Sequence, residues 1–338
     1  MGKKAAVIRG DGTGPELVSA MLEVLKACNT KVELIECDAG SEWWEKHGGD
    51  SYISPETWKL LEQSDACFKG PTTTIPVPTA PRSVAVSIRQ RFGLYANIRP
   101  IKSYGKTERK LDFVCVREAT EGLYAGIEFK VGDDAAVAVR KTTRGRCEKV
   151  ANKAFEVAKQ RGFKKVVAIT KRNILKETDG IFMQAVTKAQ AQNNSIEVEE
   201  YFIDNMCQQL VKNPERFNQC VLVSTNLFMD IVSETASGHL GSIGNVYSGN
   251  IGDNYAMFEP AHGSAPKYKG MNKVNPVATI LSGAWMVEYL GEKDISKAIF
   301  AATEDVINES KYVTYDLGGN ATTSQVAEQI AIRAAKML

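Results

Sequence analysis

Residues 5–29 read AAVIRGDGTGPELVSAMLEVLKACN, and they predict a strand, a glycine-rich loop and a helix in that order. Leu17, Met21 and Val24 fall on one helical face, and Pro15 suits the first turn of that helix. The alternation returns along the chain, with strands expected at 31–37, 66–68, 165–170, 198–203 and 220–225 and helices at 54–61, 146–162, 180–192 and 227–237. Strands that alternate with helices predict an α/β protein with a mostly parallel sheet.

The whole chain has the size and composition of a globular protein with two domains. Its 338 residues exceed one ordinary hydrophobic core, and 43% of them are hydrophobic and 24% charged. No flexible linker is evident, so we expect the chain to cross between the domains more than once. The net charge is only +2 and no basic stretch is interleaved with aromatic residues, which argues against nucleic acid as a partner. No apolar run has the length of a membrane span.

Cysteine usage and the N-terminus bear on the compartment. The seven cysteines are scattered and no C-x-x-C occurs, which predicts buried free thiols rather than disulfides or a cysteine metal site. We see no targeting segment in MGKKAAVIRGDG. These features predict a reducing compartment, the cytoplasm, with an organelle matrix as the alternative.

Three arginines form the first candidate group for chemistry. Arg89, Arg99 and Arg117 lie in SIRQRFGLYANIRP and VCVREATEGLYAGIE, near predicted strand ends. Planar guanidinium groups bind carboxylates through paired hydrogen bonds, so three together suit a small polycarboxylate. Surface salt bridges are the alternative interpretation.

Three carboxylates form the second candidate group. Asp230 and Glu234 are four residues apart in a predicted helix and share a face, whereas Asp204 follows a predicted strand. Sites made only of carboxylate oxygens favour Mg²⁺ or Mn²⁺ over zinc. A solvated acidic helix face is the alternative.

Tyr124, Lys171 and the loop at 10–14 complete the candidates. Lys171 follows the strand at 165–170, where α/β folds place functional groups, and lysine acts as a base when burial or a nearby cation lowers its pKa. The loop GDGTG resembles a phosphate loop but lacks both G-x-G-x-x-G and a Walker lysine. A tight turn between strand and helix is the alternative there.

Eight motifs occur in a family-specific order over nearly the whole chain: GDGTGPE, KGPTTT, LYANIRP, VREATEGLYAGIE, STNLFMDIVSE, SGNIGD, EPAHGSAP and NPVATILSGAWM. This set resembles the β-decarboxylating dehydrogenase family of isocitrate, isopropylmalate, homoisocitrate and tartrate/malate dehydrogenases. The resemblance implies the α/β, non-Rossmann isocitrate/isopropylmalate dehydrogenase-like fold, with two α/β domains and a cleft between them. It implies a large domain of residues 1–95 and 242–338, a small domain of 96–241, and an arm around 122–142 that joins two copies into a homodimer with shared active sites.

The resemblance also implies the chemistry and the residues that perform it. A 2-hydroxy acid with a carboxylate on the next carbon loses a hydride to nicotinamide and then loses CO₂. Lys171 matches the group that takes the hydroxyl proton, and Tyr124 matches the acid that protonates the enolate. The matches for substrate binding are Ser83, Arg89, Arg99 and Arg117. The matches for Mg²⁺ or Mn²⁺ binding are Asp204, Asp230 and Glu234, the last in place of the usual Asp; Asp204 and Lys171 come from the second subunit.

The substrate is expected to be isocitrate. Residues 82–90, RSVAVSIRQ, resemble the isocitrate dehydrogenase pattern R-S-L-N-V-A-L-R-Q, in which Ser83 matches the serine near the γ-carboxylate. Ala85 departs from that pattern because it replaces an asparagine that contacts substrate and nicotinamide. No leucine-lined wall for an isopropyl group is present. Homoisocitrate, or another 3-substituted malate, is the nearest alternative.

The cofactor is expected to be NADP. Residues 258–276, FEPAHGSAPKYKGMNKVNP, match the family's adenosine-binding loop, and Lys267-Tyr268 stands where NAD-dependent members carry an acidic residue. A 2′-phosphate with about 1.5 to 2 negative charges favours an ammonium and a phenol over a carboxylate. Gly319 stands where the NADP pattern often has an arginine. The residues implied for the cofactor are Thr74, His262, Gly263, Ser264, Ala265, Pro266, Lys267, Tyr268, Val274, Asn275 and Tyr315.

A different class of function is a non-catalytic regulatory subunit of a hetero-oligomer, which this family contains. Such subunits usually lose the tyrosine, the lysine or an arginine, and all of these are present here. Ala85 and Glu234 are the two features that favour this alternative.

Overall fold

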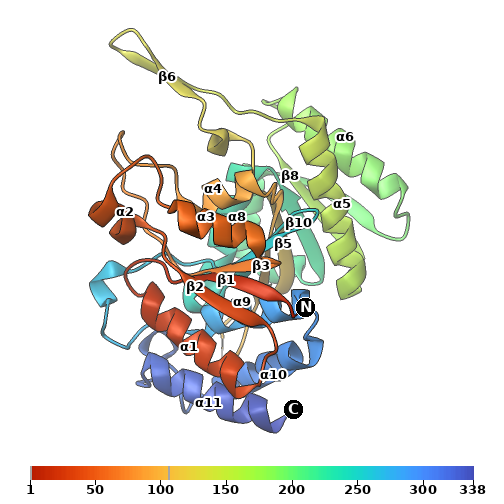
Figure 1. Ribbon diagram of the computed structural model, residues 1–338. Helices are drawn as coiled ribbons and strands as arrows, with labels where there is room; N and C mark the ends of the chain where they lie inside the picture. Colours follow the sequence, from red (N-terminus) through yellow and green to blue (C-terminus); the bar gives the residue numbers. More distant parts are fainter. Residues whose placement is uncertain (1, 106) are drawn as a thin grey trace.

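The computed structural model describes residues 2–105 and 107–338, in which one ten-stranded mixed sheet is covered by helices on both faces (Figure 1). The strand order is β2-β1-β3-β12-β11-β4-β5-β10-β8-β9. These strands are β1 Lys4–Ile8, β2 Glu33–Cys37, β3 Ala66–Lys69, β4 Ala96–Lys102, β5 Asp112–Glu118, β8 Lys165–Thr170, β9 Glu197–Phe202, β10 Cys220–Ser224, β11 Tyr247–Ile251 and β12 Ala256–Pro260. The helices are α1 Gly14–Ala27, α2 Ser41–His47, α3 Pro55–Gln63, α4 Val84–Arg91, α5 Arg144–Arg161, α6 Thr178–Ala191, α7 Ile203–Lys212, α8 Asn226–Ser237, α9 Val277–Tyr289, α10 Lys293–Glu309 and α11 Thr323–Lys336.

Most neighbouring strands are parallel, as the alternation of strands and helices predicts. Six of the nine strand pairs within the described sheet are parallel. The three antiparallel pairs are adjacent to one another, at β12–β11, β11–β4 and β4–β5. The sheet therefore has two mostly parallel halves. They are joined by the short antiparallel pairing of β4 with β11, which involves residues Ala96 to Ile98 of β4.

The segments predicted as strands and helices are strands and helices in the structure. One predicted boundary that differs from the structure lies at a candidate site residue. Ile203 begins α7 instead of ending the strand before it, so Asp204 lies in the first turn of a helix. A carboxylate there is favoured by the positive end of the helix dipole. The mixed sheet covered by helices on both faces agrees with the expected α/β class.

Four apolar clusters hold the helices to the sheet, two on each face. Alternate strand residues point to opposite faces, so Val7 packs with α1, α9, α10 and α11, whereas Ile8 packs with α3 and α4. In the other half of the sheet, Val114 packs with α5 and α6, and Cys115 packs with α7 and α8. We call the face that carries α3, α4, α7 and α8 the front face, and the opposite one the rear face. This grouping supports two domains, while the boundaries at 95/96 and 241/242 stay a prediction.

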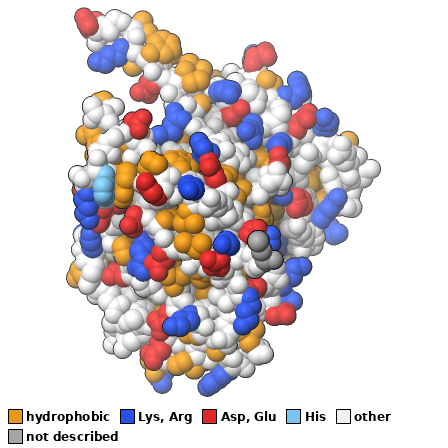
Figure 2. Space-filling view, in the orientation of Figure 1, with side chains coloured by type: hydrophobic (Ala, Val, Ile, Leu, Met, Phe, Trp, Pro, Cys, Tyr) orange, Lys and Arg blue, Asp and Glu red, His pale blue; other side chains and the backbone are white. Residues whose placement is uncertain are grey.

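A two-stranded hairpin projects from the body of the protein, at the top of Figure 1. It consists of β6 Glu128–Val131 and β7 Ala135–Ala138, and every residue of both strands is exposed. Phe129 is 53% exposed and Val131 50% exposed, and Figure 2 shows hydrophobic side chains in orange along this projection. The hairpin lies within the arm expected at 122–142. Its exposed apolar side chains are suited to contact with another chain.

The loop between β1 and α1 is a tight turn that contacts the start of α2 and the loop after β3. The Asp11 carboxylate accepts hydrogen bonds from the backbone N–H groups of Ser41 (3.0 Å), Glu42 (2.9 Å) and Thr73 (2.7 Å). Gly10 has a φ of 78°, and a Cβ there would lie 2.1 Å from the Pro71 carbonyl oxygen. These contacts favour the turn interpretation over a phosphate loop.

Substituting Gly10 by alanine is expected to destabilise the protein by about 2–4 kcal/mol, because a left-handed φ and a backbone clash both oppose the new Cβ. Gly145→Ala is the matched control, since a Cβ there meets nothing within 4 Å. Thermal unfolding followed by circular dichroism measures both variants. Equal unfolding midpoints for the two would contradict the expectation.

Expectations about membrane spans and about cysteines can also be compared with the structure. No helix in the described part of the chain is long and apolar enough to cross a membrane. All seven cysteines are free, as expected, and five of them are buried.

Candidate active site

A cavity of about 380 Å³ opens on the front face, where the two halves of the sheet meet. It lies between α4 and β12 on one side and β4, β5 and α8 on the other. Ten of the residues expected to bind substrate, metal or cofactor, or to act in catalysis, line it: Thr74, Ser83, Arg89, Arg99, Arg117, Tyr124, Asp230, Glu234, His262 and Gly263. The fold thus brings together residues that are up to 189 positions apart, from Thr74 to Gly263.

The three arginines are buried in this cavity and held by polar side chains. Arg89, Arg99 and Arg117 are only 6%, 6% and 2% exposed. Arg89 Nε donates to Asn250 Oδ1 at 2.8 Å. Arg117 donates from Nε and Nη2 to the side-chain oxygen of Asn226 at 2.9 and 2.7 Å. Their burial rules out the surface salt-bridge alternative.

Arg99 connects the arginines to the carboxylates of α8. Its Nε donates to Asn97 Oδ1 at 2.7 Å, and its Nη1 donates to Ser233 Oγ at 3.0 Å and to Glu234 Oε1 at 2.8 Å. Asp230 pairs with Arg117 and lies 3.5 Å from Arg99 Nη2. Asp230 and Glu234 therefore line the cavity and pair with its arginines, although the Glu234 side chain is also 43% exposed; this pairing argues against the acidic-face alternative.

The cavity carries more cationic than anionic groups. Four cationic side chains and three carboxylates line it. Burial, together with the neighbouring cations Arg99 and Arg89, lowers the pKa of Arg117 to about 10, so it remains protonated at neutral pH. Buried like charges favour an anionic ligand that neutralises them.

Lys69 and Glu259 form a buried ion pair beside Arg89 for which the sequence analysis predicts no role. Lys69 Nζ lies 3.0 Å from Glu259 Oε2, and Arg89 Nη2 donates to Glu259 Oε1 at 2.7 Å. Burial alone raises the pKa of Glu259, but Lys69 and Arg89 outweigh burial and hold that pKa well below its usual range. Both residues stand first in motifs on which the family resemblance rests, Lys69 in KGPTTT and Glu259 in EPAHGSAP. Their places in these motifs were the sequence signal that could have identified them.

Replacing Glu259 by glutamine is expected to lower the free energy of unfolding by about 3 kcal/mol at pH 7, because two buried cations lose their counter-ion. The folded pKa lies well below the unfolded value of about 4.3, so the contribution of the carboxylate is fully present above that value, falls progressively below it, and is gone only below the folded pKa. The difference between wild type and variant should therefore shrink on acidification. Chemical unfolding at pH 7 and at about pH 3 measures this difference, because about pH 3 lies well below the unfolded pKa. Glu304→Gln, at a half-exposed partner of Lys102, is the control, and a pH-independent gap would contradict the account.

Tyr124 is held against Asp230 and Arg117. Its hydroxyl donates to Asp230 Oδ2 at 2.5 Å, and the guanidinium carbon of Arg117 lies 4.9 Å from the ring centroid. Burial and the hydrogen bond to Asp230 raise the pKa of Tyr124. The phenol therefore carries its proton at neutral pH.

Lys171 and Asp204 lie outside the cavity and bind each other. Lys171 Nζ is 2.7 Å from Asp204 Oδ2, and the hydrogen bond from Lys171 lowers the pKa of Asp204. The Asp204 side chain is 67% exposed. Within residues 2–105 and 107–338, no group of three acidic, histidine or cysteine side chains is placed to hold a metal ion. One chain alone therefore does not bring Asp204 to Asp230 and Glu234.

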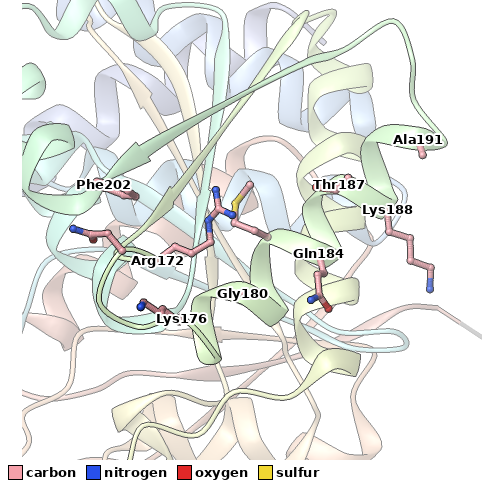
Figure 3. Close-up of a pocket in the computed structure, with 10 residues that line it drawn as sticks. Arg172, Lys176, Gly180, Gln184, Thr187, Lys188, Ala191 and Phe202 are labelled. Carbon is pink, nitrogen blue, oxygen red and sulfur yellow. The ribbon is translucent and has the colours of Figure 1, made fainter.

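A wide depression next to Lys171 is not part of this cavity. It has a volume of about 900 Å³ and runs along α6, with Arg172 and Phe202 on its other side (Figure 3). None of the predicted site residues lines it. Two of its cations are already paired, Arg172 with Glu200 and Lys188 with Glu148.

A second cavity of about 410 Å³ continues from the first, with which it shares His262 and Gly263. Of the residues expected to bind the cofactor, it is also lined by Ala265, Tyr268, Val274, Asn275 and Tyr315. Ser264 lies beneath it: its carbonyl oxygen accepts from the Thr13 N–H at 2.9 Å, and its hydroxyl is 2.6 Å from Thr73 Oγ1. Pro266 and Lys267 form the short helix η5 Pro266–Tyr268 at its edge.

Two ammonium groups and two phenols gather at this edge. Lys267 Nζ lies 4.9 Å from the Tyr268 ring centroid, and Lys273 Nζ lies 4.7 Å from that of Tyr315. The two tyrosine rings are 5.9 Å apart. The sequence analysis assigned no role to Lys273. At Gly319 a Cβ would meet the Val313 carbonyl oxygen at 2.1 Å, so an arginine does not fit there without a backbone shift.

The fold and the two joined cavities suit an α/β enzyme, with one cavity lined by buried arginines and the other continuous with it. The isocitrate/isopropylmalate dehydrogenase family profile matches residues 4–330. The chain therefore belongs to this family of β-decarboxylating dehydrogenases, which oxidatively decarboxylate 3-substituted malates. Enzymes of the family use NAD or NADP and a divalent metal ion, and they form dimers.

Relatives that act on different substrates have similar sequence identity to this chain. The chain is 38% identical to a 3-isopropylmalate/3-methylmalate dehydrogenase of Methanocaldococcus jannaschii, over 98% of each chain. It is 36% identical to a homoisocitrate dehydrogenase of the same organism, over 97% of this chain and 96% of the relative. The crystal structure of isocitrate dehydrogenase from Methylococcus capsulatus superposes with a TM-score of 0.93 at 38% identity, over 98% of this chain and 99% of that one. Family membership thus defines the reaction, and the substrate depends on the pocket itself.

Proposed function

We propose that the protein converts isocitrate to 2-oxoglutarate and CO₂ with hydride transfer to NADP. The observation that carries this proposal is the pair of joined cavities. One holds three buried arginines beside Ser83, and the other has Lys267, Tyr268 and Tyr315 near its edge. A tricarboxylate suits the first, and a nucleotide with an extra phosphate suits the second.

The arginines bind and orient the substrate. In this proposal Arg89, Arg99 and Arg117 hold carboxylates, and the Ser83 hydroxyl, which caps α4 by accepting from Val86 N–H, lies beside the carboxylate that distinguishes isocitrate. The side-chain amides of Asn97, Asn226 and Asn250 keep the guanidinium groups in fixed orientations. Bound substrate replaces solvent as the partner of these buried cations.

Asp230 and Glu234 are suited to a divalent cation. Both carboxylates converge on the Arg99 guanidinium, and oxygen donors are those that Mg²⁺ and Mn²⁺ prefer. A cation held by these residues, with Asp204 from a second copy, would polarise the substrate hydroxyl and adjacent carboxylate. The usual Asp is replaced by Glu234, whose extra methylene lets it reach Arg99.

Lys171 and Tyr124 move the protons. As a neutral amine, Lys171 would take the proton from the substrate hydroxyl while C2 gives its hydride to a bound nicotinamide. In the single chain the Lys171 ammonium pairs with Asp204 at 2.7 Å, and a divalent cation bound to Asp204 would replace that contact and favour the neutral amine. After CO₂ leaves, Tyr124 donates its phenol proton to C3. The raised pKa of Tyr124 keeps this proton available, and the hydrogen bond to Asp230 aims the hydroxyl.

The active form in this proposal is a homodimer with shared sites. Lys171 and Asp204 lie away from the cavity of their own chain, so they serve a second copy. Exposed apolar side chains occur at the end of β9, on α7, on α8 and on the hairpin, namely Phe202, Val211, Ile231, Phe129 and Val131. The seven free cysteines support a reducing compartment such as the cytoplasm.

Homoisocitrate dehydrogenase is the second candidate, and one observation favours it. Ala85 and Val86 line the arginine cavity, where the isocitrate pattern has an asparagine for Ala85. The smaller side chain leaves space for one additional methylene in the substrate. Because a methylene discriminates by only about 10- to 200-fold, the two acids must be compared directly.

Steady-state assays with both cofactors test the proposal. Purified protein with Mg²⁺ or Mn²⁺ is given isocitrate, homoisocitrate, isopropylmalate or malate, each with NADP and with NAD. The largest kcat/KM is expected for isocitrate with NADP. A preference for homoisocitrate supports the second candidate, and no turnover of any acid despite NADP binding supports the regulatory-subunit alternative.

A further inference from the structure

Asp179 is a buried carboxylate that binds the backbone of Lys171. It lies in the first turn of α6 and is only 1% exposed. Its Oδ2 accepts a hydrogen bond from the Lys171 backbone N–H at 2.6 Å. The Lys171 carbonyl oxygen in turn accepts from the N–H groups of Ile174 and Leu175 at 2.9 and 2.8 Å. Both backbone polar groups of Lys171 are therefore held within the loop that joins β8 to α6.

Arg140 pairs with the other oxygen of the Asp179 carboxylate. Its Nη2 lies 2.8 Å from Asp179 Oδ1, and its side chain is 17% exposed. Its Nη1 donates to Thr178 Oγ1 at 3.2 Å. Arg140 precedes Lys141, whose backbone is bridged to that of Gly122 at the base of the projecting hairpin. The ion pair thus joins the base of the hairpin to the start of α6.

The same guanidinium also contacts the start of α8. Its Nη2 donates to Thr225 Oγ1 at 2.7 Å, and its central carbon lies 4.7 Å from the Phe228 ring centroid. Thr225 is the N-cap residue of α8, the helix that carries Asp230 and Glu234. One ion pair therefore contacts both the loop that carries Lys171 and the helix that carries the carboxylates of the arginine cavity.

Stability alone does not explain this buried ion pair, because the cost of desolvation offsets most of the attraction and apolar residues of similar size often stabilise a fold as well. The contact of Asp179 with the backbone of Lys171 suggests a different role. A displacement of about 1 Å in an active site can lower the rate on the order of 100-fold. We propose that Asp179, held by Arg140, is a positioning residue that fixes the backbone from which the Lys171 side chain extends.

This inference rests on the proposed role of Lys171 as the proton acceptor, but not on which acid or nucleotide the cavities take. Steady-state kinetics of the full-length chain, with the acid and nucleotide that give the wild type its largest kcat/KM, provide the test. Asp179→Asn keeps the size of the side chain but has one acceptor oxygen for the two donors. Its kcat should fall about 10- to 100-fold, while KM for the acid and for the nucleotide changes less than about threefold.

Two other variants complete this comparison. Glu177→Gln is the matched control, because it removes an exposed carboxylate just before the same helix, and it should retain wild-type kcat. The double variant Arg140→Met/Asp179→Leu removes both charges of the pair, so no unpaired charge stays buried. It should lose kcat as Asp179→Asn does, and it provides the test if Asp179→Asn does not fold.

Mixing of subunits distinguishes positioning of Lys171 from damage elsewhere in the chain. With Tyr124→Phe chains, one site of each mixed dimer combines an intact Tyr124 with a correctly placed Lys171, so Asp179→Asn should regain about a quarter of wild-type activity. With Lys171→Met chains no complete site forms, so activity should not rise. Damage transmitted through α8 to the chain's own cavity would give the opposite pattern.

Three results would overturn the proposal: wild-type kcat in Asp179→Asn, a loss that appears mainly in KM, or recovery with Lys171→Met chains and not with Tyr124→Phe chains. The failure of the proposed function gives a different result, since Lys171→Met would then itself keep wild-type kcat. An active Asp179→Asn beside an inactive Lys171→Met contradicts the positioning role alone.

Discussion

Replacing Lys171 by methionine is expected to lower kcat by about 10³-fold, because methionine has a similar length but accepts no proton from the substrate hydroxyl. The substrate KM should change far less, since the arginines that we propose to bind the substrate carboxylates are untouched. Steady-state kinetics with saturating metal and cofactor measure both constants. Lys188→Met is the matched control: it removes an exposed lysine of α6 that pairs only with Glu148, and it should retain wild-type kcat.

The same substitution also tests whether active sites are shared. Tyr124→Phe alone is expected to be similarly impaired, because it lacks the phenol proton. Mixed with the Lys171→Met chain, it should regain activity, since in a mixed dimer one site has both Tyr124 and Lys171. Random exchange of subunits in a symmetric dimer gives about a quarter of wild-type activity. No recovery after subunits have exchanged would contradict the placement of Lys171 across the dimer.

Reversing the charge at Lys267 is expected to have the second largest effect. Lys267→Asp should lower kcat/KM for NADP at least ~100-fold, because a carboxylate then faces the 2′-phosphate, while kcat/KM for NAD stays the same or rises. Lys311→Asp is the control for net charge, since Lys311 is exposed and lies against Tyr312, away from the cavity edge. Equal losses of kcat/KM with NADP and with NAD would show that Lys267 stabilises the loop but does not interact with the 2′-phosphate.

The parts of the fold that depend on local periodicity were predictable from the sequence. The unit from β1 to α1 shows why: Leu17, Met21 and Val24 repeat at helical spacing and are all fully buried in the structure. The helix α9 shows the limit. It is buried on nearly all sides, so its apolar residues mark no face, and no prediction covers it. The antiparallel contact of β4 with β11 joins residues about 150 positions apart and has no local signal.

Some residues of the candidate site could be predicted from the sequence, and others could not. The ordered motifs pointed to the arginines, to Tyr124 and to the carboxylates of α8, and the structure places all of these around one cavity. Asn97, Asn226 and Asn250 were missed because an asparagine that orients a guanidinium looks like any other polar residue in sequence. Lys69 and Glu259 were missed because their significance lies in pairing across 190 positions, at 3.0 Å.

The positions of Lys171 and Asp204 also have a physical explanation. Their side chains contact each other at 2.7 Å and are 25% and 67% exposed, and the Lys171 ammonium lies 5.7 Å from the centroid of the exposed Phe202 ring. Side chains that complete a site across a symmetric interface are separated from that site in a single chain. The apparent absence of a three-carboxylate cluster within the described residues is therefore what the proposal expects.

We propose that this chain oxidatively decarboxylates isocitrate with NADP. The most direct test follows NADPH by absorbance and CO₂ release from carboxyl-labelled isocitrate in the same reaction, with Mg²⁺ present. The account predicts that NADPH, CO₂ and 2-oxoglutarate form in equal amounts, and faster than with any other acid or with NAD. Formation of NADPH without CO₂, or no product from isocitrate under conditions where NADP binds, would contradict it.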